Sequence, residues 1–482
     1  MAIDQGTTSS RVILFELNGE VVATFRREFS CFYPQSGWVE QDANAIWQDC
    51  FELCNDAFSY ASEHNLEIAS IGIANQRETV VFFDKETQQA ICPAIVWQDR
   101  RTTSYCEQLI ADGHSKLIRN KTGLVIDAYF SASKIRWGLK NNEDVKQALS
   151  EQRLAIGTID SWLLFKLSGG AIHATDTSNA SRTMLFDIGQ QRWCNKLLEL
   201  FEVPKSILPQ VLNTVDDYQK TAIGLFGQEV PIRALIGDQQ AATIGQGCLN
   251  ALDGKCTLGT GAFAMRNIGT DFSLADNGLL TTILFSRDGL THFATEGSIF
   301  SSGSTIQWLR DSLKIVGSAP DTERIAASIN DTGGVYFVPA FSGLGSPYWQ
   351  PHARASISGM SGATTRAEII RAALESVSYQ CFDLFGGSPP KTLLVDGGMA
   401  ANDWLLQHLA DILQCTISRP TNLEATAWGA ARCAGAKFGL LEELPSDTIS
   451  ADSFNPQMPT QLRDEYISEW HAAVAACLHN DA

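Results

Sequence analysis

The chain has 482 residues, too many for a single hydrophobic core, so we expect two or three domains. Hydrophobic residues make up 44% of it and charged residues 19%, which indicates globular domains with sizeable cores. Asp and Glu outnumber Lys and Arg by 54 to 36 with no basic block, and the net charge of −18 argues against nucleic acid or an anionic membrane as a partner. The twelve cysteines form no C-x-x-C pair, no leader peptide opens the chain, and no apolar run is long enough for membrane insertion, so we expect a cytoplasmic protein.

The N-terminal part of the chain predicts short strands around one helix. Strand-like runs occupy residues 11–16 and 21–29, and two more follow at 68–74 and 79–83. Between these pairs, apolar residues recur at helical spacing behind Asp42, a residue type that suits an N-cap. This alternation predicts a mixed α/β domain.

A glycine turn opens the chain in the segment AIDQGTTSSR, residues 2–11. Glycine and small hydroxyl residues let backbone N–H groups approach a polyanion, and a neighbouring carboxylate can hold Mg²⁺ through water. Asp4, Thr7, Thr8 and Arg11 therefore suit a nucleotide phosphate and its metal ion. An ordinary hairpin of the same composition needs no ligand and is an equal alternative at this stage.

Two more glycine turns follow later in the chain. CTLGTGAFAM, residues 256–265, satisfies G-x-G-x-x-A, but a strand-like run rather than a helix follows it, which favours a second phosphate turn over a dinucleotide site. LLVDGGMAAND, residues 393–403, predicts a strand, a turn and a helix that begins near Asn402, where a diphosphate could bind. A simple Asn cap explains that turn equally well, but three such turns in one chain favour phosphate binding.

Two polar clusters follow strands that look buried. In IANQRETVVF, Arg77 and Glu78 are costly to bury side by side unless each has a partner, and a polyhydroxylated substrate would be one; a surface ion pair is the alternative. In ALIGDQQAATIG, Asp238 precedes a helix of small residues, where it could take a proton from a substrate hydroxyl or simply cap the helix.

The last third of the chain repeats the α/β pattern. A capping box at Thr365 and Glu368 announces a helix, and strands at 392–395 and 415–418 enclose another. One glycine and threonine turn in each half suggests an internal duplication. We therefore expect an N-terminal domain over residues 1–248 and a C-terminal domain over residues 249–482.

Together these stretches resemble the FGGY family of carbohydrate kinases and, within it, the branch that phosphorylates glycerol. The resemblance extends over nearly the whole chain, from DQGTTSSR and GWVEQD through NQRET, VWQDRR, GDQQAA and LGTGAF to DGGMAAN. It includes both family signatures, the one from Tyr129 through Ser131 and Lys134 to Trp137, and the one from Ala355 to Glu375. It implies an α/β fold of two ribonuclease-H-like, actin-like ATPase domains with a central cleft, glycerol and the first phosphate turn in the first domain, and ATP or ADP on the second.

The resemblance also implies residue roles for the ATP- and Mg²⁺-dependent conversion of glycerol to sn-glycerol 3-phosphate in glycerol catabolism. Asp238 would be the general base and Asp4 would position Mg²⁺. The glycerol-binding residues would be Arg77, Glu78, Trp97, Tyr129, Asp238, Gln239 and Phe263. The residues that hold ATP or ADP would be Thr7, Thr8, Arg11, Gly259, Thr260, Gly303, Gln307, Gly398 and Asn402. Relatives form assemblies, so a homodimer or homotetramer is expected.

Two other functions fit part of the pattern. A non-catalytic nucleotide switch of the same fold would use the three turns but not Arg77, Glu78, Trp97 and Asp238. A sister kinase for another polyol, such as erythritol, would use them all. The segment LFGQEVPIR, residues 225–233, lacks the Gly-Gly-Thr-Arg sequence through which some bacterial members bind fructose 1,6-bisphosphate, so we expect no such regulation here.

Overall fold

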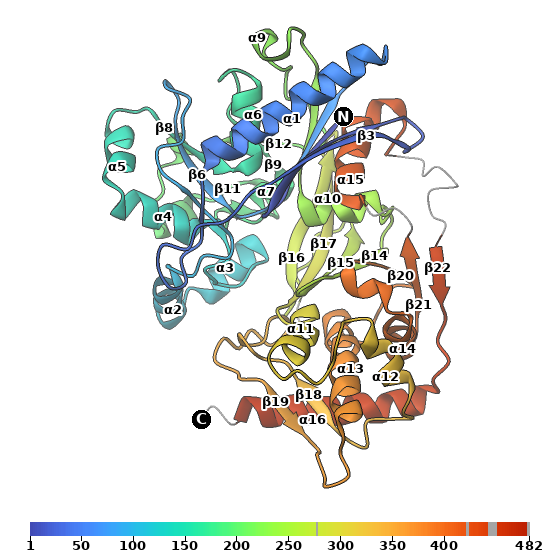
Figure 1. The fold of residues 1–482 in the computed structure, drawn as a ribbon. Coiled ribbons are helices and arrows are strands. Elements are labelled where there is room, and N and C mark those ends of the chain that lie inside the picture. The colour runs from blue at the N-terminus through green and yellow to red at the C-terminus, as the bar shows by residue number, and fades with distance from the viewer. Residues whose placement is uncertain (276–277, 421–423, 442–450, 480–482) are drawn as a thin grey trace.

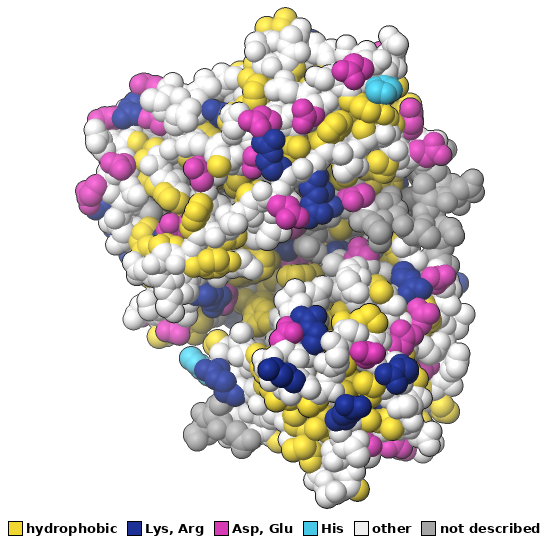
Figure 2. All heavy atoms as spheres, viewed as in Figure 1, with side chains coloured by type: hydrophobic (Ala, Val, Ile, Leu, Met, Phe, Trp, Pro, Cys, Tyr) yellow, Lys and Arg dark blue, Asp and Glu magenta, His cyan; other side chains and the backbone are white. Residues whose placement is uncertain are grey.

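The computed structural model describes residues 1–275, 278–420, 424–441 and 451–479. Figure 1 shows two lobes, the N-terminal half of the chain above in blue and green and the C-terminal half below in yellow to red. Figure 2 shows that the surface is hollowed between them. The middle of the chain, including strands β14 to β17, lies where the two lobes meet (Figure 1).

The N-terminal half is built on a five-stranded sheet in the order β13-β5-β1-β2-β3. Its strands are β13 (Ile232–Gly237), β5 (Ile71–Asn75), β1 (Ala2–Gln5), β2 (Ser9–Phe15) and β3 (Val21–Glu28). β1, β2 and β3 are antiparallel neighbours, whereas β5 and β13 run parallel to β1. Every residue of β1 and β5 is buried, as is typical of central strands covered on both faces.

The C-terminal half contains a seven-stranded sheet in the order β16-β17-β15-β14-β20-β21-β22. Its strands are β16 (Leu280–Arg287), β17 (Leu290–Ile299), β15 (Ala262–Gly269), β14 (Gly254–Leu258), β20 (Thr392–Asp396), β21 (Thr416–Pro420) and β22 (Ala451–Phe454). From β17 to β21 it repeats the first sheet read from β3 to β13: three antiparallel strands followed by two parallel ones. The expected pair of ribonuclease-H-like domains is confirmed by this repeated topology.

Two helices pack between the sheets. α10 (Asp238–Gly245) follows β13 directly, and α15 (Ala425–Ala434) comes from the C-terminal half yet packs on β1, β5 and β13 of the N-terminal sheet. Glycine allows their close approach, because a Cβ on Gly429 would lie 1.8 Å from the Ala241 carbonyl oxygen and one on Gly245 would lie 1.9 Å from that of Ala425. The two halves of the chain are therefore joined through a tight helix pair.

Smaller sheets and the remaining helices complete the two lobes. A four-stranded sheet contains β4 (Glu40–Gln41), β7 (Ala94–Ile95), β6 (Val80–Asp84) and β8 (Leu154–Thr158). Three strand pairs are β10 (Phe186–Asp187) with β11 (Arg192–Trp193), β9 (Ala174–Asp176) with β12 (Gln210–Leu212), and β18 (Tyr336–Val338) with β19 (Ser356–Ser358). The N-terminal helices are α1 (Ala43–Glu63), α2 (Thr103–Ala111), α3 (Ser115–Thr122), α4 (Ser131–Asn141), α5 (Glu143–Ser150), α6 (Ile159–Leu167), α7 (Thr177–Ala180), α8 (Asn195–Leu200), η1 (Lys205–Ile207) and α9 (Ile223–Phe226). The C-terminal helices are α11 (Gly303–Asp311), α12 (Asp321–Ala327), α13 (Arg366–Phe385), η2 (Gly398–Ala401), α14 (Asp403–Leu413), η3 (Ala436–Phe438) and α16 (Thr460–His479).

The local sequence signals fall where they were expected. The side chain of Asp42 caps α1, the Thr365 and Glu368 capping box opens α13, and Asn402 caps α14. The second glycine turn leads into strand β15, not a helix, which agrees with the rejection of a dinucleotide fingerprint. All twelve cysteines are free, and in the described parts of the chain no helix is long and apolar enough to cross a membrane.

Candidate active site

The candidate site lies at one edge of the N-terminal sheet, beside residues of strands β14 and β17 of the C-terminal sheet. β5 and β13 are parallel neighbours, so their carboxyl ends meet at one edge of the N-terminal sheet, the edge at which ligands bind in open α/β sheets. Arg77 and Glu78 follow β5, and Asp238 follows β13 at the start of α10. Gly237 makes room for this convergence, because a Cβ there would lie 2.7 Å from Cδ of Arg77.

The guanidinium group of Arg77 is held by Glu296, which the sequence analysis did not assign to the site. Nη1 and Nη2 of Arg77 donate to Oε2 and Oε1 of Glu296, both at 2.8 Å. Glu296 lies on β17 of the C-terminal sheet, and only 2% of the Arg77 side chain and 1% of the Glu296 side chain are exposed. This bidentate ion pair therefore connects the two halves of the chain inside the site.

A second buried arginine completes the network. Nε of Arg182 donates to Oε1 of Glu78 at 2.6 Å, and Nη2 of Arg182 donates to Oε1 of Glu296 at 3.2 Å. Two arginines and two glutamates thus neutralise one another, which is what burial of four charges requires. The surface ion pair considered for Arg77 and Glu78 is excluded, because both side chains are buried.

The two glutamates respond differently to this environment. Burial alone would raise the pKa of Glu296, but the charges of Arg182 and Arg77 outweigh it and lower that pKa to about 2. Burial raises the pKa of Glu78 despite the same two arginines. Glu78 also has a backbone φ of 60°, in the left-handed region that is strained for a residue with a side chain, and such strain concentrates at functional sites.

Asp238 is the carboxylate of this group that faces open space. Its side chain is 29% exposed, Oδ1 lies 3.4 Å from Nε of Arg77, and the same oxygen accepts a hydrogen bond from the Gln239 N–H at 2.7 Å. Burial raises the pKa of Asp238, the positive charge of Arg77 opposes the increase, and the negative charge of Asp4 adds to it. Asp238 is helical rather than the N-cap, a position that Gly237 occupies.

Gln239 and Lys255 lie beside Asp238. Nζ of Lys255 donates to Oε1 of Gln239 at 2.6 Å and to Oγ1 of Thr257 at 2.9 Å. Lys255 is fully buried on β14, and burial lowers the pKa of its ammonium group. Gln239, an expected polyol ligand, is thus oriented by a cation from the C-terminal sheet.

Aromatic residues form one wall next to the network. The rings of Trp97 and Tyr129 meet edge to face with centroids 5.5 Å apart, and Nε1 of Trp97 donates to Oγ1 of Thr7 at 2.9 Å. The hydroxyl of Tyr129 accepts from Nη2 of Arg77 at 3.4 Å. This wall therefore joins the expected polyol residues to the first glycine turn.

The first family signature has a structural explanation here. Nζ of Lys134 donates to the backbone carbonyl oxygens of Ala128, Tyr129 and Phe130, and Oγ of Ser131 donates to the Glu78 carbonyl oxygen at 3.0 Å. Burial lowers the pKa of Lys134 to about 8. The signature residues therefore fix the backbone that carries Tyr129 and Glu78.

The first glycine turn joins β1 to β2. The Gly6 N–H donates to the Ser9 carbonyl oxygen at 2.9 Å, and Arg11 contacts the Asp4 carboxylate while donating to Oε2 of Glu424 at 2.6 Å. Arg11 is therefore paired with two carboxylates, one from each half of the chain. Burial raises the pKa of Asp4, and Arg11 opposes the increase.

The residues at this turn fit a magnesium ion held mainly by a nucleotide. Asp4 is buried near the end of β1, and its negative charge adds to the upward shift of the Asp238 pKa. Mg²⁺ prefers such oxygen donors together with phosphates and retained waters. No group of three or more His, Cys, Asp or Glu side chains suited to a metal occurs in the described part of the chain, so an all-protein cage is absent there.

The second and third glycine turns lie close together in the C-terminal half. The Gly303 N–H at the start of α11 donates to the Gly259 carbonyl oxygen at 2.9 Å, and a Cβ on Gly303 would lie 2.6 Å from that oxygen. A Cβ on Gly397 would lie 2.5 Å from the Leu258 carbonyl oxygen. A Cβ on Gly398, in contrast, would meet no atom within 4 Å, so this backbone is open to a ligand.

The remaining expected site residues differ in their contacts and exposure. Oδ1 of Asn402 accepts from the Leu405 N–H at 2.9 Å, and Nδ2 donates to Oγ1 of Thr322 at 3.4 Å, so Asn402 is a helix cap in this state. Thr8, Thr260 and Gln307 are exposed, and Phe263 on β15 is half-buried. Because Thr8, Thr260 and Gln307 are exposed, their polar side chains are accessible to a ligand.

Four buried polar residues of the site were missed from the sequence: Arg182, Gln240, Lys255 and Glu296. Nη1 of Arg77 donates to Oε1 of Gln240 at 3.2 Å, and each of the four contacts a residue that was predicted: Arg77, Glu78 or Gln239. The available signal was a charged residue inside an apolar or small-residue strand, as in THFATEGSIF and GKCTL. A charge there requires a partner, but the sequence does not name it.

Comparison with known proteins identifies the family of the chain. Residues 1–245 match the N-terminal domain, and residues 254–438 the C-terminal domain, of the FGGY family of carbohydrate kinases. The chain belongs to this family. The chain is 45% identical over 483 residues to the glycerol kinase of Rhodospirillum rubrum, covering 98% of each chain, and 47% identical over 486 residues to glycerol kinase 1 of Lactiplantibacillus plantarum, covering 99% of this chain and 96% of that one.

Its fold also superimposes on a solved FGGY structure. The crystal structure of Plasmodium falciparum glycerol kinase with ADP matches with a TM-score of 0.93 at 34% identity, covering 99% of this chain and 97% of that chain. The buried ion network combines Arg77 and Glu78 from the segment matched to the N-terminal FGGY domain with Glu296 from the segment matched to the C-terminal one. The site of this FGGY kinase is thus shared between both domains.

Proposed function

We propose that this FGGY kinase transfers the γ-phosphoryl group of ATP to a terminal hydroxyl of glycerol, forming sn-glycerol 3-phosphate and ADP. The observation that carries the proposal is the convergence of Arg77, Glu78 and Asp238 at one sheet edge, where Glu296 from the other half holds Arg77 and Arg182 holds Glu78. The relatives that are 45 to 47% identical over nearly the whole chain are glycerol kinases, which supports the same substrate.

Glycerol would bind through hydrogen bonds from its three hydroxyl groups. Arg77 supplies donors, Glu78 and Asp238 supply acceptors, and their charges strengthen each bond. Gln239 and the Tyr129 hydroxyl add polar contacts, while Trp97 and Phe263 cover the carbon chain. The network of ion pairs fixes these groups before the substrate arrives, which lowers the entropy cost of binding.

Asp238 would act as the general base. As the terminal oxygen of glycerol forms a bond to the γ-phosphorus, the bond from that phosphorus to the β–γ bridging oxygen breaks, and the hydroxyl proton moves to the Asp238 carboxylate. Its raised pKa makes it a better proton acceptor than an ordinary aspartate. Arg77, 3.4 Å away, keeps the carboxylate oriented.

ATP would be held by the three glycine turns. Thr7, Thr8 and Arg11 come from the first turn, Gly259 and Thr260 from the second, and Gly398 and Asn402 from the third. Gly303 and Gln307 come from α11, whose first N–H donates to the Gly259 carbonyl oxygen. Bound Mg²⁺ would neutralise charge on the phosphates, with Asp4 holding it through water. We place the domain boundary between residues 248 and 249, so that closure of the two domains excludes water from the reacting phosphate.

A coupled assay of ADP release over glycerol, dihydroxyacetone, erythritol, xylulose and ribulose tests this proposal. We expect glycerol to give the highest kcat/KM. A preference for erythritol would instead support the sister polyol kinase, and ATP binding without any polyol-dependent ADP release would support a nucleotide switch. A cytoplasmic location, where ATP is supplied, and an assembly of two or four copies remain predictions, which fractionation and sedimentation would test.

A further inference from the structure

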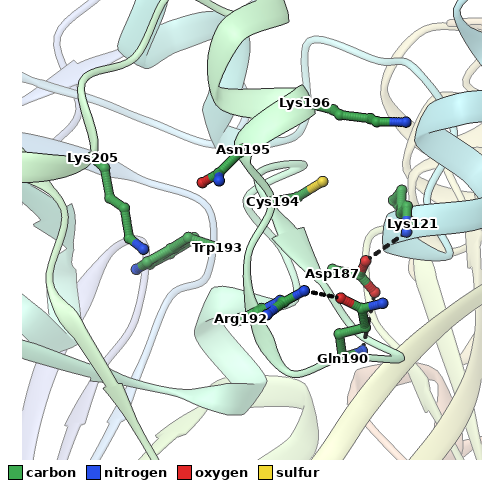
Figure 3. Close-up of a pocket in the computed structure, with 9 residues that line it drawn as sticks. All are labelled: Lys121, Asp187, Gln190, Arg192, Trp193, Cys194, Asn195, Lys196 and Lys205. Atoms are coloured by element: carbon green, nitrogen blue, oxygen red, sulfur yellow. Dashed lines mark hydrogen bonds and ion pairs between the residues drawn. The ribbon is translucent and has the colours of Figure 1, made fainter.

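A cavity lies outside the candidate active site. Its volume is about 290 Å³, at the lower end of the range for small-molecule sites, and α3, the β10–β11 hairpin, α8 and η1 contribute to it (Figure 3). The residues that line it are Lys121, Asp187, Gln190, Arg192, Trp193, Cys194, Asn195, Lys196 and Lys205. None of them belongs to the polyol or nucleotide residues described above.

The charge of this cavity is opposite to that of the chain. Lys121, Arg192, Lys196 and Lys205 line it with Asp187 as the only acidic residue, whereas the whole chain carries a net charge of −18. Figure 3 shows Lys121 and Lys196 on one side of Cys194 and Lys205 and Trp193 on the other. Four cations around one concave space in an acidic protein favour a small anion.

The single acidic residue is already neutralised. Nζ of Lys121 donates to Oδ2 of Asp187 at 2.9 Å, and Oδ1 of Asp187 accepts from the Gln190 N–H at 3.0 Å. Arg192 donates through Nη2 to Oε1 of Gln190 at 2.6 Å, a neutral partner. Lys196 and Lys205 form no ion pair or side-chain hydrogen bond with the described residues, so the cavity keeps an excess of positive charge.

We propose that this cavity binds the phosphate group of a small phosphorylated metabolite. Lysine and arginine are the side chains that bind phosphate, and a doubly charged phosphate ester would engage several of them at once. The ring of Trp193 is fixed, because Nε1 donates to the Pro209 carbonyl oxygen at 2.9 Å, and it offers an apolar wall to the carbon part of the ligand. Nucleic acid is disfavoured, because the cavity is small and the rest of the chain is acidic.

Equilibrium dialysis with labelled sn-glycerol 3-phosphate and with inorganic phosphate, at constant ionic strength, tests the proposal. Saturating glycerol, ADP and Mg²⁺ would be present to compete for the candidate active site. We expect saturable binding of the ester to the wild type and at least about tenfold weaker binding to the variant Lys196→Gln/Lys205→Gln. The two single variants should show intermediate losses.

The matched control is Lys314→Gln/Lys391→Gln, which removes two exposed lysines elsewhere and should bind like the wild type. Phosphorylation of glycerol should be unchanged in both double variants, so a failure of the anion site is distinguishable from a failure of the proposed kinase activity. Absence of saturable binding, or equal binding by both double variants, would overturn the proposal. A change of oligomeric state in the Lys196→Gln/Lys205→Gln variant without ester binding would assign the cavity to a protein interface and would also overturn it.

Discussion

Glu296 binds both terminal nitrogens of Arg77 at 2.8 Å, so a residue on a C-terminal strand holds a side chain that follows an N-terminal strand. Arg77 is in turn 3.4 Å from Asp238, the proposed base. This chain of contacts makes Glu296 a positioning residue. In the proposed function it would act on the polyol through Arg77 and connect substrate binding with the relative placement of the two halves.

The variant Glu296→Gln should therefore raise the glycerol KM. Charge-assisted hydrogen bonds contribute about 1.5 to 3 kcal/mol each, so loss of one correctly held bond predicts an increase of about tenfold or more. The KM for ATP should change little. Steady-state kinetics with each substrate varied in turn would measure both effects.

Glu375→Gln is the matched control for that variant. Glu375 is also buried and ion-paired, accepting from Nε of Arg371 at 2.8 Å and from the Tyr379 hydroxyl at 2.9 Å, but it lies on α13 outside the site. Both variants should lose stability to urea, whereas only Glu296→Gln should change the glycerol KM. Equal KM values for the two variants would remove Glu296 from its positioning role.

Much of the site could be predicted from the sequence, but the network around it could not. Arg77, Glu78 and Asp238 stand out because charged residues directly follow apolar strands, and the structure brings them together. Glu296 and Arg182 lie in segments of small and hydroxyl residues, and their partners come from 219 and 104 positions away along the chain. Pairings at such separations depend on how the two domains dock, which strand and helix periodicity does not encode.

The fold could be predicted in part, because local sequence signals mark where elements begin. Several strands and helices carry a local signal, such as the Asp42 cap or the capping box at Thr365, and these elements begin close to those signals. The packing of α15 on the sheet of the opposite half carries no local signal. It depends on Gly72, Gly245 and Gly429, whose need for a missing Cβ is visible only once their neighbours are known.

Gly398→Ala should weaken nucleotide binding without unfolding the protein. A Cβ at Gly398 would meet nothing within 4 Å, so the added methyl group fits the protein but would occupy space proposed for the diphosphate. We expect the KM for ATP to rise at least several-fold while the melting temperature stays near that of the wild type. Gly362→Ala, at another glycine whose Cβ would meet nothing, is the control and should change neither. An unchanged ATP KM in Gly398→Ala would place the nucleotide elsewhere.

Asp4→Asn should increase the concentration of Mg²⁺ needed for activity. The carboxylate is proposed to hold the ion through water, and loss of such outer contacts typically costs about tenfold to a hundredfold in metal affinity. Titration of Mg²⁺ at fixed ATP would measure the shift. The binding of glycerol, followed by calorimetry without metal, should be unaffected. An unchanged Mg²⁺ requirement would show that Asp4 does not hold the ion and serves only in its ion pair with Arg11.

The acidic limb of the pH profile should reflect Asp238. Only its carboxylate form accepts a proton, and burial raises its pKa from 3.8, so activity should fall as the pH decreases through a value above 3.8. The dependence of kcat/KM for glycerol on pH would give this value for the free enzyme. The acidic limb should persist in the variant Asp4→Asn, and this result would distinguish titration of Asp238 from titration of Asp4. A limb at or below 3.8 would contradict a base in this environment.

The most direct test of the proposed chemistry is the kcat of Asp238→Asn with glycerol and MgATP. Asparagine keeps the shape and most hydrogen bonds of the side chain but cannot take the proton, and general-base assistance is typically worth about 10² to 10⁴ in rate. We predict a loss of at least about a hundredfold, with ATP binding intact by calorimetry and the fold intact by circular dichroism. Part of that loss would come from poorer orientation of the hydroxyl, because the transition state of phosphoryl transfer can be largely dissociative. A variant that keeps more than about a tenth of the wild-type kcat, outside the usual range for removal of a base, would show that Asp238 only binds the polyol or supports the helix.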